Sequence, residues 1–136
     1  MQFLEYARGQ DMAQEVYERQ AQFFSALSHP VRLRIIDILA QGDACVCHLS
    51  AALQQRQAYV SQQLAKLREV GLITDQKEGL YVYYRLADEE IAQLLHEARQ
   101  CLVNLTGDQS LLRVQVPAHG EFDCPCPRCQ TRLSNR

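Results

Sequence analysis

Cysteine is the residue type with the clearest chemistry in this chain of 136 residues, and five of its six cysteines fall in two groups. Cys45 and Cys47 are separated by one residue, and three more thiols lie in the segment Cys124-Pro125-Cys126-Pro127-Arg128-Cys129. Three thiolates suit arsenite, and four suit cadmium, lead or, less favourably, zinc. The spacing therefore predicts a site for a thiophilic metal or metalloid ion formed by Cys45, Cys47, Cys124, Cys126 and Cys129.

The ligands of this ion can combine in several ways. Cys45 begins a predicted short helix, 45–53, in which residues i and i+2 point about 200° apart. Chelation by Cys45 and Cys47 therefore requires the helix end to distort. A tail cysteine from either subunit could supply a third thiolate, several could complete a four-thiolate site, or the tail could bind its own ion. His48 is a further candidate ligand and His119 a weaker one.

Paired thiols also support redox chemistry, because thiolates of low pKa at a helix start can be oxidised to a disulfide or polysulfide. A thiol oxidoreductase is disfavoured, since its Cys-x-x-Cys is expected within a βαβ pattern and Cys126 to Cys129 lies among prolines. The sequence contains no Ser/His/Asp set, paired carboxylates or glycine-rich phosphate loop placed for catalysis. We therefore expect a protein that is not an enzyme.

The remaining composition is that of an ordinary globular chain, with 47% hydrophobic and 22% charged residues and a net charge of −2. No apolar run approaches the ~18 residues of a membrane helix, and the first residues lack a secretory signal. We expect a cytoplasmic protein, in which cysteines serve as metal ligands or redox groups. Residues 54–85 hold five basic and three acidic side chains, a mildly basic region that favours an anionic partner.

Apolar periodicity predicts a mainly α-helical chain with a small β-hairpin. We expect helices over 11–27, from Pro30 to before Gly42, over 45–53 and 58–70, and from an N-cap at Asp88 to Gly107, with strands at 72–76 and 80–86. This order is that of a winged helix-turn-helix. The predicted organisation is a DNA-binding and dimerisation domain over residues 1–107 and a cysteine-rich tail over 108–136.

The second helix of a helix-turn-helix pair enters the major groove of double-stranded DNA. Glutamines such as Gln62 and Gln63 can pair with adenine, whereas Lys66, Arg68 and Lys77 suit phosphates. The complete set of predicted DNA-contacting residues is Gln57, Tyr59, Ser61, Gln62, Gln63, Lys66, Arg68 and Lys77.

Several stretches resemble the ArsR/SmtB family of metal-responsive repressors: LSHPVRLRII at 27–36, CVCHL at 45–49, VSQQL at 60–64, LREVGLI at 67–73 and YYRL at 83–86. The resemblance implies a homodimer, formed through its first and last helices, that releases operator DNA when a ligand binds. It also implies that Cys-Val-Cys is similar to the family's sensor site for arsenite, cadmium or lead. The family often has Ser-x-His-His-Leu in its recognition helix, where this chain has Ser61-Gln62-Gln63-Leu64, so the operator sequence does not carry over.

The last predicted helix carries the sixth thiol, Cys101, within its apolar stripe, where burial at the dimer interface is expected. Some family members bind zinc on this helix through carboxylates and histidines. The matching positions here, Asp88, Glu90, Cys101 and Asn104, form a poor set of zinc ligands. We therefore expect no zinc site there.

Overall fold

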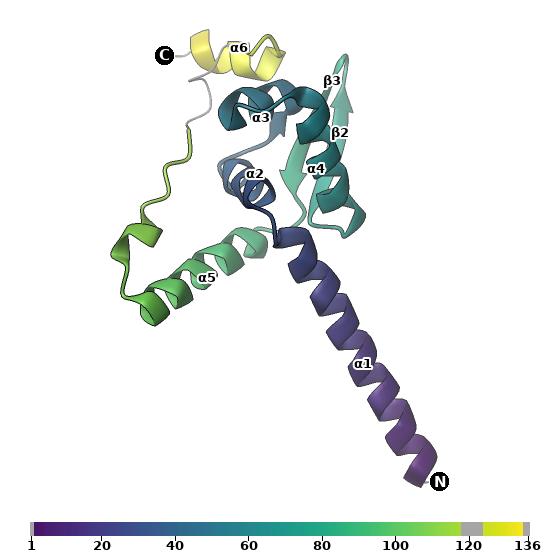
Figure 1. Cartoon of the computed structure of the whole chain (residues 1–136). Helices are drawn as coiled ribbons and strands as arrows, with labels where there is room; N and C mark the ends of the chain where they lie inside the picture. Colours follow the sequence, from purple (N-terminus) through teal and green to yellow (C-terminus); the bar gives the residue numbers. More distant parts are fainter. Residues whose placement is uncertain (1, 118–123, 135–136) are drawn as a thin grey trace.

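The structure is a computed structural model that describes residues 2–117 and 124–134 (Figure 1). His119 lies outside the described residues. The elements in chain order are α1 (Gln2–Leu27), α2 (Pro30–Ala40), β1 (Ala44–Cys45), α3 (Val46–Leu53), α4 (Gln57–Glu69), β2 (Ile73–Glu78), β3 (Tyr81–Leu86), α5 (Glu90–Thr106), a 3-10 helix η1 (Gln109–Leu112) and α6 (Pro127–Ser134).

The centre of the fold is the packing of α2, α3 and α4 around one apolar core. Ile36 of α2, Leu49 of α3 and Leu64 of α4 all belong to this core and have almost no exposed surface. α2 starts as predicted, because Pro30 occupies the first turn, where its missing N–H costs nothing. The preceding His29 caps this helix, since its ring Nδ1 accepts a hydrogen bond from the Val31 N–H at 3.2 Å.

The predicted hairpin is confirmed, but the sheet has a third strand. The order is β1-β3-β2, and all pairs are antiparallel. β2 continues to Glu78, so the turn is shorter than predicted, and Gly79 adopts the positive φ of 60° that the turn requires. Cys45 does not begin the short helix: its backbone is extended and pairs with Tyr83 before α3 begins at Val46. The predicted winged helix-turn-helix is confirmed with this addition.

The first and last long helices leave apolar surface exposed. α1 starts earlier than predicted and projects away from the other elements (Figure 1). Met12, Val16, Leu102 and Leu105 are exposed large apolar side chains on these two helices. Cys101 of α5 is also exposed in the single chain, and is therefore not buried by the chain's own fold.

The ends of α5 follow the predicted signals closely. Gly107 ends the helix with φ 74°, as a C-terminal glycine does. The N-cap is Glu89 rather than Asp88, although the Asp88 carboxylate still accepts a hydrogen bond from the Glu90 N–H at 2.9 Å. None of the helices in the described part of the chain is long and apolar enough to cross a membrane.

The tail is more ordered than its sequence pattern indicates. It contains η1 and α6, and α6 lies over α3 beside the hairpin (Figure 1). Pro127 is the first residue of α6, the position at which proline suits a helix. The tail cysteines thereby reach β1 and β3.

Candidate metal centre and nucleic-acid interface

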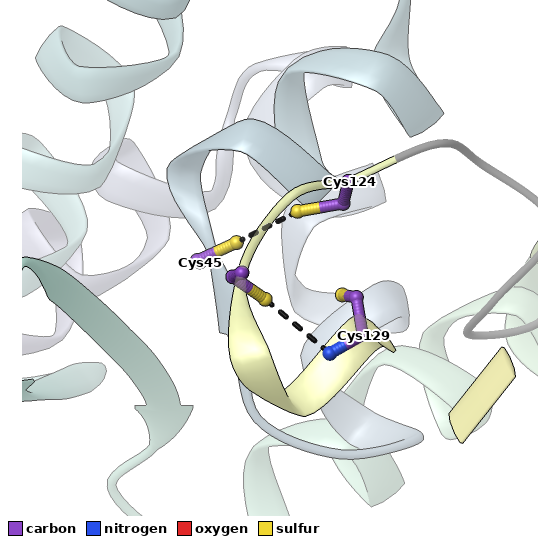
Figure 2. A group of neighbouring side chains, drawn as sticks. Cys45, Cys124 and Cys129 are labelled. Carbon is purple, nitrogen blue, oxygen red and sulfur yellow. Dashed lines mark hydrogen bonds between the residues drawn. The ribbon is translucent and has the colours of Figure 1, made fainter. Parts of the chain in front are cut away.

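Four thiols from distant parts of the sequence converge in this structure. The Sγ atoms of Cys45, Cys124, Cys126 and Cys129 all lie within 4.8 Å of one another. The Cys45 and Cys124 Sγ atoms point toward each other at 3.4 Å (Figure 2). A tetrahedral ion with metal–sulfur bonds of about 2.3 Å requires sulfur–sulfur distances of about 3.8 Å. The four thiols, here called the thiol cluster, therefore have the spacing of a four-thiolate site.

The sheet and the last helix hold the thiol cluster together. Cys45 is fixed by its pairing with Tyr83 and stands at the N-cap of α3. Cys129 lies in the first turn of α6, and its N–H donates to the Cys126 Sγ at 3.4 Å (Figure 2). The Gln130 side chain donates to the Cys124 carbonyl at 2.8 Å, which closes the loop that carries the three tail thiols.

All four thiols of the cluster are buried, but their pKa values shift in different directions. Burial raises the pKa of Cys45 to about 12, and it also raises the pKa values of Cys124 and Cys129. Cys126 is buried as well, but hydrogen bonds from the Cys129 N–H and the Tyr83 hydroxyl lower its pKa to about 7. Cys126 is thus the thiol most ready to act as a thiolate, and an incoming ion must displace protons from the other three.

Cys47 is not among the four converging thiols, and its binding of an ion together with Cys45 stays a prediction. Cys47 lies in the first turn of α3, whereas Cys45 is extended and precedes this helix. Cys47 packs at the edge of the cluster, and its Sγ accepts a hydrogen bond from Gln57 Nε2 at 3.4 Å. It therefore contacts the first residue of α4 instead of the ion site.

Sequence reasoning missed two residues beside the cluster. Tyr83 is buried and hydrogen-bonds Cys126 through its hydroxyl. Arg128 lies between two of the tail cysteines and contacts the Tyr83 ring. The only signal for Arg128 was its position between cysteines, and Tyr83 gave none. His48 is fully buried, with its Nδ1 3.8 Å from the Cys129 Sγ, so it lies next to the cluster and outside the group of four.

The predicted DNA-contacting residues are distributed along α4 and β2. Six of them are exposed: Gln57, Ser61, Gln62, Lys66, Arg68 and Lys77. Arg68 forms an ion pair with Asp75 at 2.9 Å. Tyr59 is half-buried, and its hydroxyl lies 3.4 Å from His29 Nε2.

Gln63 is a correction, because its side chain is only 5% exposed and cannot reach a base edge. It follows Val60 by three residues and precedes Leu67 by four, so it lies on the same face of α4 as these core residues. The buried Gln63 side chain is therefore not available for a contact with a base.

Comparisons with known proteins agree with this architecture. Residues 29–75 match the family model described as bacterial regulatory protein, arsR family. The chain is 41% identical over 86 residues to the transcriptional repressor SmtB homolog of Synechocystis sp., which covers 63% of this chain and 65% of that protein, just under two thirds of its length. It is 42% identical over 84 residues to the arsenical resistance operon repressor of Escherichia coli, covering 59% of this chain and 72% of the repressor.

Two solved structures share the fold over most of their length. The crystal structure of Mycobacterium tuberculosis Rv0081 has a TM-score of 0.64 and 34% identity, and the match covers 69% of this chain and 95% of that one. The solution structure of the homodimeric winged helix-turn-helix domain of Mb0332 from Mycobacterium bovis has a TM-score of 0.66 and 29% identity, covering 73% and 93%. The chain belongs to the arsR family of bacterial transcriptional regulators.

Proposed function

We propose that this chain is a cytoplasmic, homodimeric repressor that binds double-stranded operator DNA through α4 and the β2–β3 hairpin. It releases the operator when a thiophilic ion binds the thiol cluster. The observation that carries this proposal is the convergence of four buried thiols at the N-cap of α3, the helix that packs against α4.

The number of thiols favours a divalent cation. Cadmium, lead and zinc accept four thiolates, whereas arsenite accepts three. All four thiols of the cluster belong to one chain, so a complete site needs no ligand from a second subunit. We therefore propose Cd²⁺ or Pb²⁺ as the effector, with Zn²⁺ and a three-thiolate arsenite complex as the competing cases for experiment.

The proposed mechanism is a linkage between two binding events. An ion that draws Cys45 toward the tail acts directly on the start of α3, and α3 and α4 share one apolar core. If the ion binds the DNA-free shape more tightly, DNA must weaken ion binding by the same factor. A strong shift in population requires a few kcal/mol of differential affinity, which two subunits with one ion each can supply together.

The proposed dimer follows from the exposed apolar residues of α1 and α5, including Met12, Val16 and Leu105. The Mb0332 domain, whose fold this chain shares, is described as homodimeric. A second copy would cover these side chains and present two copies of α4 to successive major grooves, about 34 Å apart.

Gln62→Ala is expected to weaken operator binding by about 1–3 kcal/mol, because an exposed glutamine on a recognition helix can make a bidentate contact with adenine. The measurement is fluorescence anisotropy with the operator and with an unrelated duplex. Gln93→Ala on α5 is the matched control, since this exposed glutamine lies outside the helix-turn-helix. Equal operator affinities for the Gln62 variant and the unmodified chain would show that α4 does not read bases through this residue.

The test of the proposed function is an operator titration of the metal-free protein, kept reduced by a phosphine that does not compete for metal. The operator is a duplex selected from a randomised pool with that same protein. Addition of Cd²⁺ or Pb²⁺ is expected to release the duplex. Tight binding of zinc without release would assign the cluster a structural role, and retention of DNA with every ion would contradict the proposal.

A second candidate function, redox sensing, is favoured by the 3.4 Å separation of the Cys45 and Cys124 Sγ atoms. The two thiols would lose two protons and two electrons to form a disulfide, and hydrogen peroxide would accept them and become two waters. A parallel titration with peroxide in place of metal separates the two functions. Release by peroxide alone would assign the cluster to redox sensing.

A further inference from the structure

Arg128 connects the tail to both edges of the small sheet. We propose that this arginine is a positioning residue that couples an ion in the thiol cluster to the β2–β3 hairpin. This inference rests on the proposed function, because it concerns how an ion at the cluster reaches the DNA-binding surface.

The guanidinium of Arg128 makes three polar contacts with two carboxylates. Its Nη2 and Nε donate to the two carboxylate oxygens of Glu78, at 2.6 Å and 3.1 Å, in a bidentate pair. Its Nη1 donates to Asp43 Oδ2 at 3.0 Å. A bidentate pair fixes orientation as well as distance, so Arg128 orients the Glu78 carboxylate and also holds Asp43 through a single hydrogen bond.

A fourth contact, with an aromatic ring, places the same group over the sheet. The guanidinium carbon lies 4.0 Å from the centroid of the Tyr83 ring, a cation–π arrangement. Tyr83 pairs with Cys45 on one side and with Gln76 on the other, and its hydroxyl hydrogen-bonds Cys126. Arg128 therefore covers the residue that joins the thiol cluster to the strands of the hairpin.

The two carboxylates belong to residues at opposite edges of the sheet, next to β1 and at the end of β2. Asp43 precedes β1 and also pairs with Arg85 of β3 at 2.7 Å. Glu78 is the last residue of β2 and follows Lys77, one of the residues proposed to contact phosphate. A side chain bound to both carboxylates ties the hairpin to the segment that carries Cys45.

Arg128 lies among the tail cysteines, so an ion bound by these cysteines restrains the contacts of the arginine. Three of the four clustered thiols lie within four residues of Arg128, and Cys129 is its neighbour in α6. An ion bound by these thiols fixes the backbone on both sides of the arginine, so it holds the guanidinium against Glu78. A hairpin held in this way has less freedom to follow the phosphate backbone, which lowers affinity for the operator.

Arg128→Ala is expected to keep the affinity for Cd²⁺ within about threefold of the unmodified chain, because Arg128 supplies no thiolate. The ratio of operator affinities measured without and with Cd²⁺ is expected to fall about tenfold, within the usual range of coupling between two sites. Glu78→Gln removes the negative charge and one of the two acceptor oxygens that Arg128 binds, and it should lower the ratio in the same direction. Arg113→Ala, an exposed arginine earlier in the tail, is the matched control.

Hydrogen exchange gives a measurement that does not involve DNA. Cd²⁺ is expected to protect amides of both β1 and the β2–β3 hairpin in the unmodified chain, and those of β1 alone in Arg128→Ala. Full retention of the affinity ratio and of hairpin protection in this variant would overturn the inference. A loss of Cd²⁺ affinity far beyond threefold would also overturn it, because Arg128 would then build the site. If Cd²⁺ leaves the operator affinity of the unmodified chain unchanged, the proposed function itself fails.

Discussion

Cys45→Ser is expected to abolish release of the operator by Cd²⁺, whereas Cys47→Ser is expected to leave release close to that of the unmodified chain. Cys45 belongs to the thiol cluster, and Cys47 instead accepts a hydrogen bond from Gln57. Loss of residues that only support metal ligands costs roughly 10–100-fold in affinity, so loss of a ligand is expected to cost at least about 100-fold. Chelator competition measures the Cd²⁺ affinity, and anisotropy measures release.

The two variants control for each other, because they make the same substitution two residues apart. Serine is close to cysteine in size, and its hydroxyl can still accept the hydrogen bond from Gln57. Thermal unfolding and operator affinity of both metal-free variants are expected to remain near those of the unmodified chain. Loss of release in Cys47→Ser with normal release in Cys45→Ser would mean that the ion binds at the start of α3 without the cluster.

Cd²⁺ is expected to raise the thermal stability of the chain strongly, and a chain that ends at Pro117 should lose this effect. An ion that binds only the folded state stabilises it by about 4 kcal/mol at a thousandfold excess over its Kd. For a chain of this size the shift in Tm is at least about 10 °C. Differential scanning calorimetry at a fixed excess of free ion measures it.

The shortened chain is a meaningful control because, among the residues that the structure describes, the main apolar core contains none beyond Val116. Its metal-free melting temperature is therefore expected to lie within a few degrees of that of the full chain. It retains Cys45, Cys47 and Cys101, so any contribution of these thiols alone is measured directly. An equal Cd²⁺-induced shift in both chains would exclude the tail from the site.

Local signals in the sequence were sufficient for α2, α4, α5 and the hairpin. Pro30 marks the start of α2 and Gly107 the end of α5, because each residue has a backbone preference that suits only such a position. The periodicity of α4 also contained the information that Gln63 faces the core. The prediction that Gln63 faces DNA rested on its polar side chain, whereas its helical position places it with the core residues.

The contacts that complete the site are long-range, and no local pattern encodes them. β1 is two residues long and exists because Cys45 pairs with Tyr83, 38 positions later. Cys45 and Cys124 are 79 positions apart. The composition of the tail predicted a ligand cluster, but the contacts of Arg128 with Asp43 and Glu78 join residues that are ordinary charged residues when viewed in sequence alone.

The most direct test of metal-linked operator release is the affinity of the reduced protein for Cd²⁺, measured by chelator competition with the protein free and with the protein saturated by its operator. We expect the operator to weaken Cd²⁺ binding by the same factor by which Cd²⁺ weakens operator binding. The result that would contradict it is a Cd²⁺ affinity that is the same in the free protein and in the operator complex.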